Sequence, residues 1–425
     1  MKRQPSPFLP AALLLTAPLA LLLGSCAGAA RARQEVPYEA VRARIEAGDP
    51  QGALTEYDQA MRERPAGPDE RLLRAQLLLA SDRRDEARAE LESLAAEHPD
   101  QTEALALLGR LRQEDGDTPG ARDLFQRALQ AEPGNFTALH GLGRILFDEG
   151  SYPEALVRFD RALEVERGFS FAFADRARTR AALEDWAGAA ADLDEAVRLD
   201  PEDPWNYLDR GKLRLRSRAL NEAEQDFARC LALDPENFLA RVLRAGVLEE
   251  RGRTAEAIAD YEQALRLRPD YDFAFAPLAV LHYIEGNWDR AGDLFRLAFR
   301  AQPAEPAYAL LAALCRRQAG RNREAGELLG GLAATQDPNS WELQAARYLA
   351  NPALENVMLA DIVKEPNRVK RGRLLFYLAS QFLLEGRTAP ALTYLAEAAE
   401  SERRDLPERR IAAALLQSYG REETE

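Results

Sequence analysis

The chain has 425 residues, with 56 basic and 70 acidic side chains and a formal net charge of −14. This charge argues against nucleic acid or an anionic lipid surface as the main partner, because both attract cationic proteins. Only three cysteines are present, which excludes a fold held together by a framework of disulfide bonds.

Residues 1–25 have the features of an export signal. Two basic residues precede an apolar run at 8–23, which is shorter than the roughly 20 residues of a membrane-spanning helix. Small residues follow, in the order typical of a secretory signal. The tetrapeptide LGSC at 23–26 resembles a bacterial lipobox. That resemblance implies cleavage before Cys26 and acylation of Cys26, and more than one acyl chain gives stable membrane anchoring. An ordinary signal peptide that contains a cysteine is the alternative.

Residues 26–37 are predicted to form a lipidated tether. About 11 residues span at most ~40 Å when extended, so whatever follows would work close to the membrane. Ala27 follows the cysteine, which under the enterobacterial sorting rule favours the outer membrane. We therefore expect a lipid-anchored protein of the cell envelope, at the outer membrane and facing the periplasm.

A 34-residue period runs through residues 38–337. Proline recurs on this period, with alanine twelve residues before it and a large apolar residue eight residues before it. The prolines are Pro65, Pro99, Pro133, Pro201, Pro235, Pro269 and Pro303, and Arg167 stands at the one omitted place. The pattern resembles the tetratricopeptide repeat, a helix–turn–helix unit. The resemblance implies an all-α superhelix of about eight to nine helix pairs with a concave groove lined by the first helix of each pair.

Glycines near the end of the first helices suit a left-handed helix end. They are Gly48, Gly116, Gly150, Gly252, Gly286 and Gly320. A second pattern links the seventh and twenty-third repeat positions. Four repeats have arginine at the seventh position, and each of these has an acidic residue at the twenty-third. These predicted ion pairs within a repeat are Arg74–Glu90, Arg176–Asp192, Arg210–Asp226 and Arg244–Asp260.

The period stops near residue 335, and residues 338–425 are predicted to form a C-terminal helical module. We expect a helix containing Trp341, a short acidic helix, one further repeat-like pair at 372–400, and a last helix at about 407–419 that caps the apolar end of the array. The order of these helices, with FYL at 376–378, resembles the tail of NlpI-type outer-membrane lipoproteins. That resemblance implies an adaptor that gathers cell-wall hydrolases, or a protease and its substrate.

The chain offers little catalytic chemistry. Its three histidines, His98, His140 and His282, stand far from one another and from cysteine in the sequence. No zinc or haem signature is present, so we expect no enzyme, no metal and no cofactor. Cys230 replaces a small packing residue of the repeat and is predicted to be a buried thiol.

The ninth position of the first helices, which faces the groove in tetratricopeptide repeats, is basic over four consecutive repeats. We call Arg110, Arg144, Arg178 and Lys212 the basic column. We expect it to bind acidic side chains or a C-terminal carboxylate, because guanidinium pairs with carboxylate in a bidentate manner. The alternative is that arginine is simply common on the surface of this chain. In later repeats the groove is predicted to be apolar, with Phe273 and Tyr283 suited to an apolar peptide face.

Two functions remain open. One is a membrane-anchored scaffold or adaptor that binds protein or peptide segments, which we expect to be acidic. The other is a structural assembly factor for an outer-membrane complex, such as a pilotin-like or barrel-assembly lipoprotein. Both have protein partners and a membrane contact through the lipid, neither involves nucleic acid, and a homodimer is compatible with either.

Overall fold

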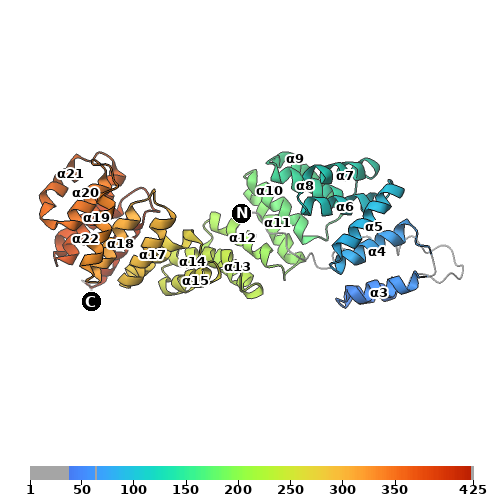
Figure 1. Ribbon diagram of the computed structural model, residues 1–425, viewed down its shortest axis with the longest axis horizontal. Coiled ribbons are helices and arrows are strands. Elements are labelled where there is room, and N and C mark those ends of the chain that lie inside the picture. Colours follow the sequence, from blue (N-terminus) through green and yellow to red (C-terminus); the bar gives the residue numbers. More distant parts are fainter. Residues whose placement is uncertain (1–37, 63–64, 423–425) are drawn as a thin grey trace. The chain divides into compact units, whose positions relative to one another are not determined.

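A computed structural model describes residues 38–62 and 65–422. The predicted export signal, Cys26 and the tether lie outside these residues. The described chain contains 23 α-helices and two short 3-10 helices without a strand, which confirms the predicted all-α array of tetratricopeptide-type helix pairs (Figure 1). None of these helices is both long and apolar enough to cross a membrane.

The chain divides into two compact units between residues 213 and 214, inside helix α12 (Pro204–Arg216). We describe each unit separately, as unit 1 and unit 2. Besides the first part of α12, unit 1 contains five helix pairs: α2 (Tyr38–Glu46) and α3 (Pro50–Ala60), α4 (Pro68–Ala80) and α5 (Arg84–Glu97), α6 (Thr102–Glu114) and α7 (Thr118–Ala131), α8 (Phe136–Asp148) and α9 (Tyr152–Val165), and α10 (Ser170–Ala182) and α11 (Trp186–Leu199).

Unit 2 holds the later repeats and the C-terminal helices, and one hydrophobic core extends across the predicted boundary near residue 338. Its helices are α13 (Leu220–Leu233), α14 (Phe238–Glu250), α15 (Thr254–Leu267), η1 (Asp272–Ala274), α16 (Phe275–Ile284), α17 (Trp288–Ala301), α18 (Ala307–Gln318), α19 (Asn322–Ala333), α20 (Trp341–Ala350), η2 (Pro352–Leu354), α21 (Glu355–Lys364), α22 (Arg368–Leu384), α23 (Thr388–Ala399) and α24 (Pro407–Glu422).

Each helix pair is held by a small residue packed against a large one. Gly143 of α8 lies on the ring of Phe159 of α9, and a Cβ atom at Gly143 would come within 2.8 Å of that ring. Phe159 is fully buried, as is Phe125 in the preceding pair. Burial of such a side chain stabilises the fold by about 1.5–3 kcal/mol. Cys230 of the second helix α13 stands where other repeats have a small residue such as Ala162, and it is buried, as predicted.

The turn inside each pair requires a left-handed backbone at one repeat position. All six glycines predicted to end a first helix have φ between +72° and +87°. Three repeats place Asp82, Glu184 and Arg218 at the equivalent position, with φ of +59° to +63°. The conformation is therefore dictated by the repeat geometry, and these three side chains adopt it at a steric cost.

The ion pairs predicted within a repeat are confirmed where both partners lie in one unit. Arg176 Nη2 donates to Asp192 Oδ1 at 2.6 Å, and Arg244 Nε donates to Asp260 Oδ2 at 2.7 Å. Arg74 lies 3.3 Å from Glu90. The fourth predicted pair, Arg210–Asp226, joins residues of different units and stays a prediction.

The structure adds a contact that comparison of the repeats missed. The position-seven arginine also reaches an acid of the preceding repeat. Arg176 Nη1 donates to Asp160 at 2.9 Å, and Arg210 Nη1 donates to Asp194 at 3.0 Å. One arginine thus joins two consecutive helix pairs.

The last helix, α24, does more than cap the end of the array. It packs against α16 and α22 as well as its neighbour α23, and Arg410 forms an ion pair with Glu249 of α14, 161 residues earlier. Its first turn is anchored by Glu408, which is nearly inaccessible and accepts hydrogen bonds from Arg373 at 2.9 Å and Tyr377 at 3.1 Å. The helix therefore lies on the first helices of unit 2, a set of contacts that the sequence did not predict.

Candidate partner-binding surface

The first helices α6, α8 and α10 of unit 1 form a continuous wall that carries polar contacts. Helix α6 contacts α8, and α8 contacts α10. Glu103 of α6 accepts a hydrogen bond from Thr137 of α8 at 3.0 Å, and His140 of α8 lies 2.8 Å from Asp175 of α10. We call this wall, made of α6, α8, α10 and the part of α12 up to residue 213, the first-helix surface of unit 1.

Two members of the basic column are neutralised by carboxylates of the same wall. Arg178 forms ion pairs with Asp175 and, at 3.6 Å, with Asp209. Lys212 Nζ lies 3.1 Å from the same Asp209. Their positive charges are already compensated, so a ligand carboxylate would compete with the chain's own acids.

Arg110, the first member of the column, is withdrawn from solvent. Its Nε lies 3.9 Å from Glu114, and its side chain is 19% exposed. Burial lowers the pKa of Arg110, while the nearby Glu114 acts in the opposite direction. Burial likewise raises the pKa of Glu103 on the same helix. Arg110 therefore contributes less to the outer charge of the wall than its sequence position suggests.

Arg144 differs from the other three residues of the column. It lies on α8 and is exposed. Among residues 38–62 and 65–422, no carboxylate forms an ion pair with it and its guanidinium makes no hydrogen bond. Arg144 is therefore the cation of this column that is best placed to pair with a ligand.

The His140–Asp175 pair lies beside Arg144 and is largely buried, with 12% and 11% of the two side chains exposed. Burial lowers the pKa of His140, although Asp175 partly offsets this effect. Burial would raise the pKa of Asp175, but Arg178 and His140 hold it well below its usual range. A neutral imidazole thus contacts a charged carboxylate and fixes the His140 ring.

An aromatic cluster lies at the start of the same first helices. The Phe136 ring is 4.7 Å from Phe169 and 6.0 Å from Phe171, measured between centroids. The His140 ring lies 4.9 Å from Phe171 and meets it edge-on. Sequence reasoning missed this cluster, although the three phenylalanines stand close to a repeat boundary and could have indicated it. It places partly exposed apolar rings one to two helical turns from Arg144.

In unit 2 the two aromatic residues predicted to line an apolar groove have different surroundings. Tyr283 is 1% exposed, so it is not an accessible contact for a partner. Burial raises the pKa of Tyr283, and Tyr419 of α24 is near enough to add to that effect. Phe273 is 68% exposed and lies 5.7 Å from the Tyr271 ring. Helix α24 packs against α16, so it covers part of the helix that carries Tyr283, whereas Phe273 stays exposed.

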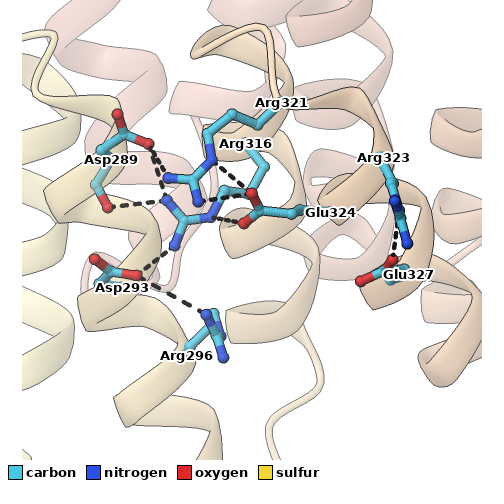
Figure 2. A network of polar contacts seen from close by, with 8 residues as sticks. All are labelled: Asp289, Asp293, Arg296, Arg316, Arg321, Arg323, Glu324 and Glu327. Atoms are coloured by element: carbon cyan, nitrogen blue, oxygen red, sulfur yellow. Dashed lines mark hydrogen bonds and ion pairs between the residues drawn. The ribbon is translucent and has the colours of Figure 1, made fainter.

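Unit 2 also contains a dense ion-pair network around Arg316 (Figure 2). Its side chain is 1% exposed and pairs with Asp289 at 3.0 Å, with Asp293, and with Glu324 at 3.4 Å. Arg321 joins Asp289 and Glu324 as well. Since the acids come from α17 and α19 and Arg316 from α18, the network ties three helices together. A cavity of about 210 Å³ lies beside it, lined by Leu328 and by charged groups that already have partners.

Metal-binding geometry is not apparent in the part of the chain that the structure covers. No group of three or more histidine, cysteine, aspartate or glutamate side chains there could hold a metal ion. Burial raises the pKa of the Cys315 thiol far above its usual value, which disfavours the reactive thiolate.

Comparison with known proteins supports the repeat assignment. Residues 44–111 and 113–172 match one family model of the tetratricopeptide repeat, and residues 208–272 match another. A stretch of 100 residues, 24% of this chain, is 41% identical to cellulose synthase operon protein C of Xanthomonas axonopodis pv. citri (strain 306). That match spans 7% of the relative's length.

Solved structures are similar in fold. The structure reported for Pseudomonas aeruginosa pilF is 20% identical, covering 48% of this chain and 92% of that chain with a TM-score of 0.44. YrrB, described as a tetratricopeptide-repeat protein with an unusual peptide-binding site, is 21% identical, covering 43% of this chain and 95% of that chain with a TM-score of 0.38.

Proposed function

We propose that this protein is a lipid-anchored adaptor of the bacterial cell envelope, which binds segments of partner proteins on the first-helix surface of unit 1. The LGSC sequence at 23–26 supports the anchor at Cys26. The acidic net charge supports protein rather than nucleic acid as the partner. Cell-wall hydrolases or an envelope protease are the partner classes that the NlpI-like tail suggests.

The observation that carries the binding proposal is the contrast between the two units. In unit 2, helix α24 packs against the first helices α16 and α22. In unit 1, the exposed Arg144 stands on the equivalent helices without a carboxylate partner among the described residues. An exposed cation on a wall that otherwise compensates its own charges is suited to a partner's carboxylate.

The test is affinity capture with the full-length, lipidated protein in detergent, followed by quantification of the envelope proteins retained. Arg144→Glu should reduce recovery of the specific partners more than tenfold, because a charge-assisted hydrogen bond is worth about 1.5–3 kcal/mol once desolvated. Arg127→Glu is the matched control, since Arg127 lies on the second helix α7, with a side chain 44% exposed.

Added salt should weaken the capture, because attraction between exposed charges is screened over ~8 Å at physiological ionic strength. Equal recovery of every retained protein by wild type, Arg144→Glu and Arg127→Glu would refute binding through this surface. Anchoring is tested separately with Cys26→Ser, so the two parts of the proposal can fail independently.

A further inference from the structure

The charges on the first-helix surface of unit 1 restrict the kind of ligand that it can hold. Arg178 and Lys212 are neutralised by Asp175 and Asp209, and Arg110 is mostly buried beside Glu114. A ligand with many carboxylates would meet one available cation and several repelling acids. A single carboxylate at Arg144 avoids that repulsion.

The aromatic cluster supplies the second contact. Phe136, His140 and Arg144 are spaced four residues apart on α8, and therefore lie on one face of this helix. Phe171 of α10 closes the apolar end of the face, where its ring meets His140 edge-on at 4.9 Å. Phe136 and Phe171 are partly exposed, so an apolar side chain of a ligand can cover them.

The helix geometry sets the spacing between the two contacts. With a rise of about 1.5 Å per residue, the Cα atom of Arg144 lies about 6 Å beyond that of His140 and about 12 Å beyond that of Phe136. An extended peptide advances about 3.3 Å per residue. Its apolar side chain and its carboxylate should therefore be two to four residues apart.

Unit 2 provides an internal comparison for this arrangement. Three repeat lengths after Phe136, Phe169 and Phe171, the chain has Phe238, Tyr271 and Phe273, and these rings also contact one another, at 5.4 and 5.7 Å. The residues equivalent to His140 and Arg144 are Val242 and Gly246. The aromatic element is thus present in both units, whereas the cation is present only in unit 1.

The helix that packs on the first helices of unit 2 agrees with the absence of this cation there. Its first helices carry α24, whose Ile411 and Ala412 are fully buried in the shared core. An apolar first-helix surface therefore holds the apolar face of a helix. In unit 1, His140 and Arg144 stand in place of Val242 and Gly246. A ligand of unit 1 therefore needs one negative charge to pair with Arg144.

From these observations we infer that unit 1 binds a short extended peptide segment that has one carboxylate on Arg144 and one aromatic or large aliphatic side chain on the Phe136–Phe171 cluster. The two groups are two to four residues apart, and polyacidic segments are disfavoured. This inference rests on the proposed function and names the ligand class for the same surface.

The test measures binding of fluorescent, amidated hexapeptides to the full-length protein in detergent by fluorescence anisotropy. The reference peptide has phenylalanine as its third residue, aspartate as its sixth and serine or glycine elsewhere. We expect replacement of the aspartate by asparagine, or of the phenylalanine by serine, to weaken binding by about tenfold or more. A hexaglutamate peptide should bind more weakly than the reference.

Two protein variants assign these preferences to the surface. Arg144→Ala should abolish discrimination between aspartate and asparagine while keeping the preference for phenylalanine. Phe171→Ala should do the reverse, and circular dichroism checks that its helices are intact. Arg127→Ala should behave like wild type. The peptide comparisons on the unmodified protein test the inference even if Phe171→Ala does not fold.

Several results would overturn the inference: no measurable binding of the reference peptide, equal or tighter binding of hexaglutamate, or unchanged aspartate preference in Arg144→Ala. If these occur while Arg144→Glu still reduces partner capture, the adaptor function stands and only the ligand class is wrong. If Arg144→Glu leaves capture unchanged, the proposed function itself is wrong.

Discussion

Arg176 offers the sharpest test of how consecutive repeats are held together. Its guanidinium donates to Asp192 at 2.6 and 2.9 Å and to Asp160 at 2.9 Å. The side chain of Arg176 is 16% exposed and that of Asp192 is 4% exposed. Arg176→Leu keeps an apolar stem but leaves the buried Asp192 with Arg180 as its remaining ion-pair partner in the structure, at 2.9 Å.

The expected cost follows from these contacts. Removal of one partner of a buried ion pair costs about 3–5 kcal/mol. Because Arg180 still contacts Asp192, and because Asp160 is 44% exposed and can be hydrated, we expect the lower value of about 2 kcal/mol. This free energy corresponds to local opening that is about 30-fold more frequent.

Hydrogen exchange followed by mass spectrometry measures this opening in peptides that cover α10 and α11. Arg198→Leu is the control, because Arg198 is on α11, is 66% exposed and pairs with Glu195 one turn away. Such a surface change alters stability by less than about 0.5 kcal/mol. The double variant Arg176→Leu with Asp192→Leu should lose less free energy of opening than the two single variants together. We expect the difference to be about 1 kcal/mol. Exchange in Arg176→Leu no faster than in the control, or additive losses, would refute this reasoning.

Three further predictions concern the turns, the anchor and pH. Glu184→Gly should raise the free energy of unfolding by about 1 kcal/mol, since a side chain at φ +62° is strained; a lower urea midpoint would show that Glu184 makes a compensating contact, and Gly150→Ala should show the opposite change. Wild-type protein should enter the detergent phase on temperature-induced phase separation and Cys26→Ser should remain in the aqueous phase; identical partitioning of the two would contradict acylation at Cys26. Burial holds the pKa of His140 below its usual value, so below about pH 6.5 the unfolded chain binds a proton that the folded chain resists. Stability should therefore fall as the pH drops from 7.5 to 5.5, and His140→Gln should make the decline in melting temperature shallower; an unchanged slope would rule out His140 as its source.

The repeat periodicity by itself determined most of the local structure. The 34-residue spacing of proline, alanine and large apolar residues predicted the helix pairs, and glycine spacing predicted turns that the structure has at φ near +75°. Comparison of the repeats predicted Arg176–Asp192 and Arg244–Asp260. These features could be predicted because each repeat contacts mainly its neighbours, so the contacts recur at fixed sequence distances.

The candidate site depended on contacts that do not recur. The basic column appeared uniform in sequence, yet Asp175 and Asp209 neutralise Arg178 and Lys212 and leave Arg144 as the exposed cation of the column without an ion-pair partner among the described residues. Which acid reaches which arginine depends on side-chain directions across neighbouring helices, and the sequence does not specify these.

The fate of the apolar surface in unit 2 was also decided only by tertiary structure. Helix α24 returns to the earlier first helices, where it packs against α16 and Arg410 meets Glu249 across 161 residues of sequence. A single long-range contact of this kind has no periodic signature, because it is formed once by a helix outside the repeat. The free energy of burying apolar area favours such a return, but the sequence alone does not indicate which of several apolar faces the helix will cover.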